Sequence, residues 1–361
     1  LSSIFFSFII EGIIVGKQFK TLYIVKKRDL EDSLSVEVNN LYAAHHRGHD
    51  VHVVYPKDLF VKHNELYAIT RQPNAAKLSS IESFVEYLKN PQFMLDNRVP
   101  VRDFDVIFSR TVPKTREESL SDNAVINYLQ CMKTLYPGIA FINDPDAISK
   151  AGSKIYDSLV LGDTLPDTHI TKDEVRIKEI LKKGDEWIAK PVHGLGGTDI
   201  IGINKDYKKN LGALIQLLLR DLYSSTDEPR PFILQDKLEG LERRLVLLNG
   251  SEIVGSYGKI LSEDDIRGNS EMGATYTDYD PTEIDLKLVS KIAPILQKDG
   301  LYLTAVDIIG PENKANLKNT KILELNARCP QWSKGIKDWS KIGEISDKII
   351  QFAEDLHAEK N

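Results

Sequence analysis

Three oxygen-bearing side chains near the C-terminal end of the sequence are candidates to hold a metal ion. Asp307 lies within an apolar run, and Glu324 and Asn326 lie two residues apart in a second one. Residues two apart on a strand face the same side of a sheet. A carboxylate in apolar surroundings is costly unless it is paired or metal-bound, and Mg²⁺ takes one or two carboxylates together with water and nucleotide phosphates. The pattern favours a magnesium site, although a salt-bridged or exposed trio is an equal alternative.

A glycine-rich turn follows a short apolar run in the middle of the chain. The run ends at Lys190, and Gly194, Gly196 and Gly197 come directly after it. Glycine lets backbone N–H groups approach phosphate oxygens closely, and the lysine adds a positive charge. The spacing is neither that of a Walker motif nor that of a Rossmann fingerprint. Taken alone, the turn indicates a structural role more often than a phosphate site.

A third stretch combines a strand edge with a run of charges. The apolar run from Phe232 leads into Gln235, Asp236, Lys237 and Leu238, and Glu242-Arg243-Arg244 follows. Amide groups at a strand edge can bind adenine, and arginine forks can bind phosphates. A solvent-facing charge run is the more common interpretation of such a pattern.

The first part of the chain has the pattern of a parallel α/β layer. We expect strands at 21–25, 51–55, 105–109 and 140–142, with helices at 33–47 and 123–136. Strand, helix, strand order is typical of parallel sheets with helical connections. We place a domain boundary near Asn143.

The elements after this boundary carry the candidate residues. Asn249-Gly250 between two apolar runs predicts a β-hairpin, and the other expected elements are helices at 154–161, 206–223, 284–298 and 343–356 and strands at 187–191, 232–235, 244–248, 252–257, 303–309 and 321–326. We expect an apolar extension at 1–16, an N-terminal substrate-side domain at 17–143, a lid subdomain at 144–238 and a catalytic subdomain at 239–361.

In this order the motifs resemble the ATP-grasp superfamily, and within it the bacterial-type glutathione synthetases. The resemblance covers the chain from about Lys20 to Leu356. It implies an N-terminal parallel α/β (pre-ATP-grasp) domain, followed by a two-subdomain ATP-grasp fold with antiparallel sheets. The motifs that carry it are Asp32-Ser33, Phe104-Asp-Val-Ile-Phe-Ser-Arg110, Asn143-Asp-Pro-Asp-Ala-Ile with Lys154, Lys190-Pro with its Gly-Gly turn, Arg267-Gly-Asn269, and Asp307, Glu324 and Asn326.

The resemblance also implies a role for each matching residue. It implies that ATP phosphates are held by Lys154, Lys190 and a loop with Gly194, Gly196 and Gly197, that adenine is lined by Gln235, Asp236, Lys237 and Leu238 with Glu242 near the ribose, and that Arg244, Arg267 and Asn269 face the transferring phosphoryl group. Asp307, Glu324 and Asn326 would hold two Mg²⁺ ions, or Mn²⁺ in their place. The implied activity is ATP-dependent joining of a carboxylate to an amine through an acyl phosphate.

The substrate pocket is where the sequence departs from these synthetases. Arg328 and Cys329 stand where the bacterial enzymes usually carry small hydroxyl residues. Arg328 could clamp a second carboxylate or form a salt bridge in its loop, and Arg110 is the other predicted substrate residue. We expect an amino acid or short peptide as substrate. A nucleotide-binding regulator without turnover and a plain nucleotide hydrolase are the alternative functions.

Composition narrows the class of partner. The net charge is −6, and Lys and Arg are spread along the chain, which argues against nucleic acid. The two cysteines, Cys131 and Cys329, lack metal-site spacing and fit a reducing, cytoplasmic setting.

The apolar start is shorter than a bilayer span requires, so no membrane contact is expected, although an interfacial anchor is the alternative for that segment. A homo-oligomer is expected from the resemblance alone.

Overall fold

The computed structural model of the protein describes residues 18–33, 35–72, 80–89, 97–111, 113, 116–184, 186–192, 200–204, 210–219, 231–262, 266, 268, 273–311 and 316–361. The chain divides into two compact units. Unit 1 contains residues 1–111, 127–142 and 342–361, and unit 2 contains residues 112–126 and 143–341. The predicted boundary near Asn143 coincides with one of the junctions. The further division at residue 238 stays a prediction.

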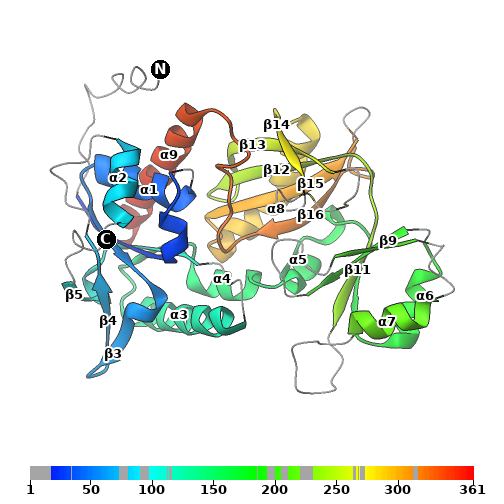
Figure 1. Cartoon of the computed structure of the whole chain (residues 1–361), viewed down its shortest axis with the longest axis horizontal. Coiled ribbons are helices and arrows are strands. Elements are labelled where there is room, and N and C mark those ends of the chain that lie inside the picture. Colours follow the sequence, from blue (N-terminus) through cyan, green and yellow to red (C-terminus); the bar gives the residue numbers. More distant parts are fainter. Residues whose placement is uncertain are drawn as a thin grey trace. The chain divides into compact units, whose positions relative to one another are not determined.

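Unit 1 is built on a parallel sheet with strand order β2-β1-β6-β7 (Figure 1). Its strands are β1 (Lys20–Val25), β2 (Asp50–Val54), β6 (Val106–Arg110) and β7 (Ala140–Ile142), and all three pairings are parallel. These strands are almost wholly buried, as expected where helices cover a parallel sheet. The predicted parallel α/β layer is therefore confirmed.

The helices of unit 1 begin and end at residues with clear physical roles. The Oγ of Ser35 caps α1 (Val36–His46) by accepting from two backbone N–H groups of its first turn, and Gly48, with φ of 84°, follows its end. Arg47 and His49 bind Glu354 on α9 (Trp339–Lys360) at 2.8 Å each. The closing helix, which we assign to the catalytic subdomain from the sequence, thus packs within unit 1. The long helix α3 (Arg116–Leu135) begins seven residues before its predicted start at residue 123.

An antiparallel sheet in unit 1 was not predicted. It contains β3 (Leu59–Lys62), β4 (Glu65–Thr70) and β5 (Asn97–Pro100), and α2 (Ile81–Lys89) lies in the same stretch of sequence. Positive φ angles at His63 and Asn64 form the tight turn between β3 and β4. Neither residue is glycine, which is why the turn is hard to find from the sequence.

Unit 2 contains a sheet with order β10-β9-β11-β8, and each of its pairings is antiparallel. Its strands are β8 (Thr168–Thr171), β9 (Glu186–Pro191), β10 (Ile201–Asn204) and β11 (Phe232–Asp236). Helices α6 (Glu174–Leu181) and α7 (Leu211–Leu219) cover it, and Ile177, Ile215 and Leu234 are fully buried in the core between them. The described part of α7 is shorter than the helix we predict over 206–223.

The second sheet of unit 2 has the order β14-β13-β12-β15-β16 and is also antiparallel (Figure 1). Asn249 and Gly250, both with positive φ, turn the chain between two of its strands. Helices α4 (Pro145–Ala151), α5 (Lys154–Val160) and α8 (Glu283–Asp299) contribute residues to its core. The strands are β12 (Leu241–Leu248), β13 (Glu252–Ile260), β14 (Thr275–Asp278), β15 (Leu303–Gly310) and β16 (Lys321–Asn326). The predicted pair of antiparallel sheets is confirmed.

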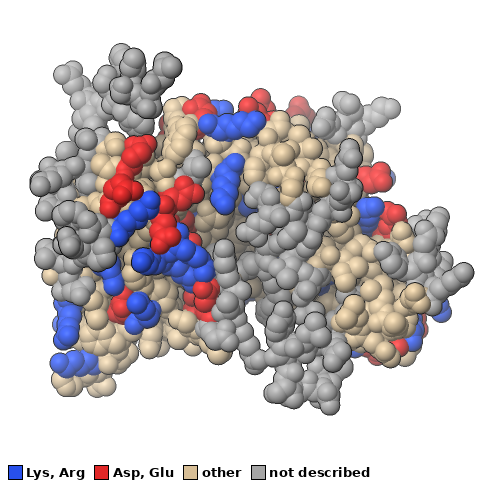
Figure 2. All heavy atoms as spheres, in the orientation of Figure 1, with Lys and Arg blue, Asp and Glu red and all other residues tan. Residues whose placement is uncertain are grey.

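The surface carries charges of both signs. On the face drawn in Figure 2, Lys and Arg side chains lie interspersed with Asp and Glu side chains, in keeping with the modest net charge of −6. Within the described residues, no helix is both long enough and apolar enough to cross a bilayer.

Candidate nucleotide and metal site

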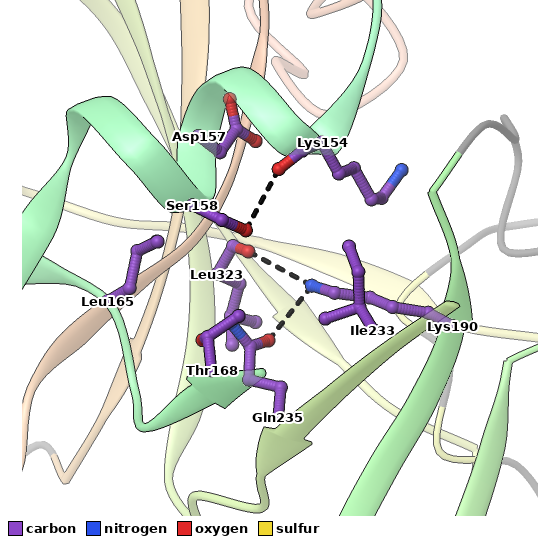
Figure 3. A pocket seen from close by; sticks show the side chains of 9 residues that line it. All are labelled: Lys154, Asp157, Ser158, Leu165, Thr168, Lys190, Ile233, Gln235 and Leu323. Atoms are coloured by element: carbon purple, nitrogen blue, oxygen red, sulfur yellow. Dashed lines mark hydrogen bonds between the residues drawn. The ribbon is translucent and has the colours of Figure 1, made fainter. Parts of the chain in front are cut away.

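Lys190 is a buried cation at the end of β9. Its Nζ donates to the Gln235 side-chain oxygen at 2.9 Å and to the Leu323 carbonyl at 3.1 Å (Figure 3). The side chain is 7% exposed, and burial lowers the pKa of Lys190. An ammonium group with two neutral oxygen partners keeps a third donor for an anion.

Lys154 is the second cation and comes from the first turn of α5. The Oγ of Ser153 caps this helix, and the backbone N–H of Lys154 donates to the Val192 carbonyl at 3.2 Å. The Lys154 Nζ lies 3.4 Å from a Glu324 carboxylate oxygen. The start of α5 is therefore tied both to the strand that carries Lys190 and to the predicted metal strand.

Asp307, Glu324 and Asn326 lie together across two neighbouring strands. Asp307 on β15 is the register partner of Glu324 on β16, and the Asn326 amide donates to Asp307 at 3.3 Å. A register irregularity directly after Asp307 changes the pairing of the strands at this point. Burial acts to raise the pKa of Glu324. The positive charges of Lys154 and the neighbouring lysines outweigh this effect and hold the pKa below its usual range.

Arg244 and Lys259 surround Asp307. The Arg244 fork donates to both oxygens of Asp307 at 2.7 and 2.6 Å, and Lys259 Nζ lies 2.9 Å from Oδ2. Lys259 also pairs with Glu242. Burial acts to raise the pKa of Asp307, but Arg244 and Lys259 hold it well below its usual range. This carboxylate is ionised throughout the physiological pH range.

Charged groups of both signs gather in this largely buried region. The described cations are Lys154, Lys190, Arg244 and Lys259, and the described carboxylates are Asp157, Glu242, Asp307 and Glu324. Buried charges are stable only where they are paired, so an anionic ligand that brings its own counter-ions could exchange partners with them.

The predicted trio fits a hard cation. Two ionised carboxylates and one amide oxygen are ligands that Mg²⁺ accepts, with phosphate oxygens and water completing its octahedron. Among the residues that the structure describes, no cluster of three or more His, Cys, Asp or Glu side chains is placed to bind a metal, so the amide of Asn326 and ligand oxygens are needed. A metal would share the Asp307 oxygens with Arg244 and Lys259.

The predicted adenine segment lies at the end of β11. The Gln235 amide donates to Thr168 Oγ1 at 3.0 Å, the Asp236 N–H donates to the Asp167 carbonyl at 2.8 Å, and Lys237 pairs with Glu186 at 2.8 Å. Leu238 is half-buried. Gln235 lines a cavity of unit 2 together with Lys154, Asp157, Ser158, Leu165, Thr168, Lys190, Ile233 and Leu323 (Figure 3).

Several predicted residues are not part of this cluster. Arg110 belongs to unit 1, where it is buried and pairs with Glu37 at 3.1 Å. Arg328 follows β16 and donates to the Asn123 side chain at 3.5 Å, and burial lowers its pKa. Residues outside the described part of the chain are Gly194, Gly196, Gly197, Arg267 and Asn269.

The sequence interpretation missed Lys259 and Asp157. A two-residue Asn249-Gly250 loop predicts that Glu242 faces Tyr257, but the longer turn and a bulge between Val246 and Leu247 place Lys259 opposite Glu242 instead. Opposite charges directly across two strands are the signal that finds this pair once the register is known. Asp157 has no such signal, because a single acidic residue in a helix is usually exposed.

Solved structures that resemble this chain include ATP-grasp enzymes. The ATP-grasp ligase PsnB in complex with a minimal precursor aligns with a TM-score of 0.57 at 16% identity over 93% of this chain and 99% of that one. D-cycloserine synthetase DcsG aligns with a TM-score of 0.56 at 14% identity over 91% and 99%. The chain therefore shares the fold of these enzymes.

Sequence comparison defines the family more closely. The ATP-grasp domain of prokaryotic glutathione synthetase matches residues 153–332, and the N-terminal domain of the same family matches residues 36–148. The chain therefore belongs to the prokaryotic glutathione synthetase family. Among curated relatives, the glutathione synthetase of Nostoc sp. is 26% identical over 86% of this chain and 90% of its own length, and that of Escherichia coli is 25% identical over 80% and 87%. The predicted family, fold and ligase class are confirmed. The ATP-grasp ligase PsnB has been solved in complex with Mg and ADP.

Proposed function

We propose that this protein joins a carboxylate to the amine of an amino acid or short peptide by way of an acyl phosphate, and that γ-glutamylcysteine and glycine are the first pair to test. The observation that carries the proposal is the contact of Lys154 with Glu324. Glu324 is the register partner of Asp307 on the neighbouring strand, and buried Lys190 donates to the carbonyl of the preceding residue, Leu323. Curated relatives of this chain are glutathione synthetases.

The chemistry requires this combination of charges. A carboxylate attacks the γ-phosphorus of ATP slowly, because both reactants are anionic. Lys154 and Lys190 would neutralise phosphate oxygens and hold the nucleotide in place. Magnesium, when bound, supplies further neutralisation; its ligands would be Asp307, Glu324 and Asn326. We propose two ions with Glu324 as the shared ligand.

Each step has a defined exchange of bonds. A carboxylate oxygen bonds to the γ-phosphorus as the bond to ADP breaks, which gives an acyl phosphate. The amine then attacks the acyl carbon, the carbon–oxygen bond breaks, and phosphate leaves while the amine loses a proton. Arg244 is the proposed donor to the oxyanion that forms during this second step, and Arg267 and Asn269 are proposed to assist it on the basis of the family resemblance.

Recognition of the acid and the amine is a finer proposal. Arg328 is proposed to bind a carboxylate of one substrate, because its guanidinium is partly buried and burial lowers its pKa. Arg110 is proposed to bind substrate on the basis of the family resemblance alone. A cytoplasmic homo-oligomer is proposed from cysteine usage and the family resemblance alone.

The test is a matrix of acids and amines incubated with purified protein, ATP and Mg²⁺, in which ADP release is measured for every pair. Release that requires both an acid and an amine supports the proposal. Release without an amine indicates a hydrolase, and tight ATP binding with no release from any pair indicates a regulator. Glu324→Gln should abolish release, whereas Glu283→Gln, at a side chain that is 91% exposed on α8, should leave it unchanged.

A further inference from the structure

The strand that carries Glu324 and Asn326 is the last strand of its sheet. On one side, β16 pairs with β15. On the open side of such an edge strand, the backbone N–H and C=O groups of alternate residues have no ladder to join. The positions of Glu324 and Asn326 therefore depend on what else holds this edge.

The pairing of β16 with β15 is also interrupted beside Glu324. Glu324 and Ile322 pair with successive residues of β15, so the register passes over Leu323. An extra residue of this kind forms a β-bulge, which locally disrupts the ladder of hydrogen bonds. The Leu323 carbonyl accepts instead from the Lys190 ammonium at 3.1 Å (Figure 3). The ladder alone thus holds Glu324 less firmly than a regular strand would.

Two buried polar side chains of unit 2 bind the same edge on either side of Asn326. Asp157 on α5 accepts the backbone N–H of Leu325 through its Oδ2 at 3.1 Å. Asn143 donates through its Nδ2 to the carbonyl of Ala327 at 2.7 Å. Both side chains are 5% exposed. The two bonds therefore fix the backbone immediately before and after a predicted metal ligand.

Asn143 is joined to the neighbouring strand as well. Its Nδ2 donates to the Leu303 carbonyl at 2.7 Å, and its Oδ1 accepts the Leu303 N–H. Leu303 is the first residue of β15, and Ala327 directly follows β16. One amide side chain thus connects the ends of the two strands that carry the predicted metal ligands.

The direction of the two ligands on β16 depends on its backbone. The Leu325 side chain packs in the core of the sheet, so Glu324 and Asn326 project from the opposite face. A rotation of the backbone at Leu325 would turn both ligands together. Hydrogen bonds that orient metal ligands from outside the coordination shell typically change metal affinity by roughly 10–100-fold.

We propose that Asp157 and Asn143 are positioning residues of the metal site, which fix the directions of Glu324 and Asn326 by binding the open edge of β16. The inference rests on the proposed function, which assigns a divalent cation to these ligands. Asp157 and Asn143 act through the backbone of β16, and neither is a ligand itself.

The experiment makes two measurements on the intact protein. Electron paramagnetic resonance gives the affinity for Mn²⁺ in the presence of saturating ADP, and calorimetry in EDTA gives the affinity for ADP alone. Asp157→Leu keeps the branched shape of the side chain and removes the acceptor. We expect Mn²⁺ to bind at least about 10-fold more weakly, and ADP alone to bind within about 2-fold of wild type.

The residues on either side of Asp157 supply matched controls. Tyr156 donates to Asp299 on α8 at 2.8 Å, and Ser158 donates to the Lys154 carbonyl at 3.0 Å. Both belong to α5, but these bonds do not involve β16. Tyr156→Phe and Ser158→Ala should therefore bind Mn²⁺ as wild type does.

Asp157→Asn separates the hydrogen bond from the charge. The amide oxygen of asparagine can still accept the Leu325 N–H, whereas the negative charge is lost. We expect this variant to keep its Mn²⁺ affinity within about 3-fold of wild type. Loss in Asp157→Leu together with retention in Asp157→Asn is a result that neither a general loss of structure nor a loss of charge would produce.

Asn143→Asp tests the second bond and decides the question if Asp157→Leu does not fold. Aspartate keeps an acceptor for the Leu303 N–H, but its carboxylate has no donor for the Ala327 carbonyl. Mn²⁺ should again bind about 10-fold more weakly, with the affinity for ADP alone preserved.

Three outcomes overturn the inference and leave the proposed function intact. They are wild-type Mn²⁺ affinity in Asp157→Leu or in Asn143→Asp, equal losses in Asp157→Leu and Asp157→Asn, and a loss of ADP affinity in EDTA as large as the loss of Mn²⁺ affinity. If wild type binds no Mn²⁺ with ADP, or if Glu324→Gln leaves Mn²⁺ affinity unchanged, the proposed function fails together with the inference.

Discussion

The Lys154 ammonium lies 3.4 Å from the Glu324 carboxylate, although the two residues come from a helix and a strand far apart in the sequence. The contact places a phosphate-binding candidate next to a metal-binding candidate. An ion pair formed in the absence of ligand neutralises both groups. When a magnesium nucleotide enters, phosphate oxygens can replace the carboxylate as partner of the lysine, and the metal can replace the lysine as partner of the carboxylate.

Lys190→Met is expected to weaken nucleotide use without unfolding the protein. Methionine keeps the apolar length of the buried side chain and removes the charge that Gln235 and the Leu323 carbonyl orient. We expect kcat/KM for ATP to fall roughly 100-fold. Steady-state kinetics at varied ATP measures the change. Lys178→Met is the control, because Lys178 is 43% exposed and pairs with Glu174 on the same helix; an equal loss in both variants would contradict the assignment.

Arg243→Met should lower the stability of the protein, whereas Arg244→Met should lower its turnover. Arg243 is buried and pairs with Asp285 at 2.7 Å, so its loss leaves a buried carboxylate short of a cation and should cost about 3–5 kcal/mol of unfolding free energy. Arg244 faces Asp307, which keeps Lys259, so Arg244→Met should mainly reduce turnover, by roughly 100-fold.

Chemical denaturation and specific activity of the folded fraction separate the two arginines. A folded Arg243→Met protein with normal stability, or an Arg244→Met protein with normal turnover, would show that the division of roles is wrong.

Magnesium should stabilise the nucleotide complex through Glu324. A ligand present at 100 times its dissociation constant adds about 2.7 kcal/mol to the unfolding free energy, which appears as a higher melting temperature. We expect ADP with Mg²⁺ to raise the melting temperature more than ADP with EDTA. This magnesium-dependent part should disappear in Glu324→Gln and persist in Glu283→Gln. A magnesium effect that survives Glu324→Gln would place the metal elsewhere.

Stability should depend on pH through Asp29 in unit 1. Burial, with the nearby Glu37, raises the pKa of Asp29 from 3.8 to about 6. A carboxyl with a raised folded pKa binds its proton more tightly when folded, so its contribution to stability is lost as pH rises from about 4 to about 6. The full shift corresponds to about 3 kcal/mol, and we expect ~1–2 kcal/mol because the side chain is 26% exposed.

Asp29→Asn should remove this part of the pH dependence and make the protein more stable than wild type at pH 7. Urea unfolding at pH 4, 5, 6 and 7 measures the difference. Parallel curves for the two proteins over this range would contradict the raised pKa.

The sequence predicts those parts of the fold in which side-chain pattern and position agree. Asp307 and Glu324 were found because each interrupts an apolar run, and the facing strands bring them together. Lys259 was missed because the register of its hairpin depends on turn length and on a bulge, which the residue types alone do not specify. The roles of these residues stay predictions.

Other differences have equally local causes. The β3 to β5 sheet escaped prediction because its strands are short and its first turn uses His63 and Asn64 instead of glycine. The closing helix was predicted over 343–356, but its place in unit 1, where Glu354 meets Arg47 and His49, was not predicted. Long-range ion pairs of this kind leave no periodic pattern in the sequence.

The acyl-phosphate route is tested most directly by the fate of the carboxylate oxygens. The acid substrate found in the matrix is labelled with ¹⁸O at its reacting carboxylate and incubated with ATP, Mg²⁺, the amine and the protein, and the released phosphate is analysed by mass spectrometry. Attack of the carboxylate on the γ-phosphorus predicts transfer of one labelled oxygen to phosphate for each amide formed. Unlabelled phosphate, released while amide accumulates, would contradict the account.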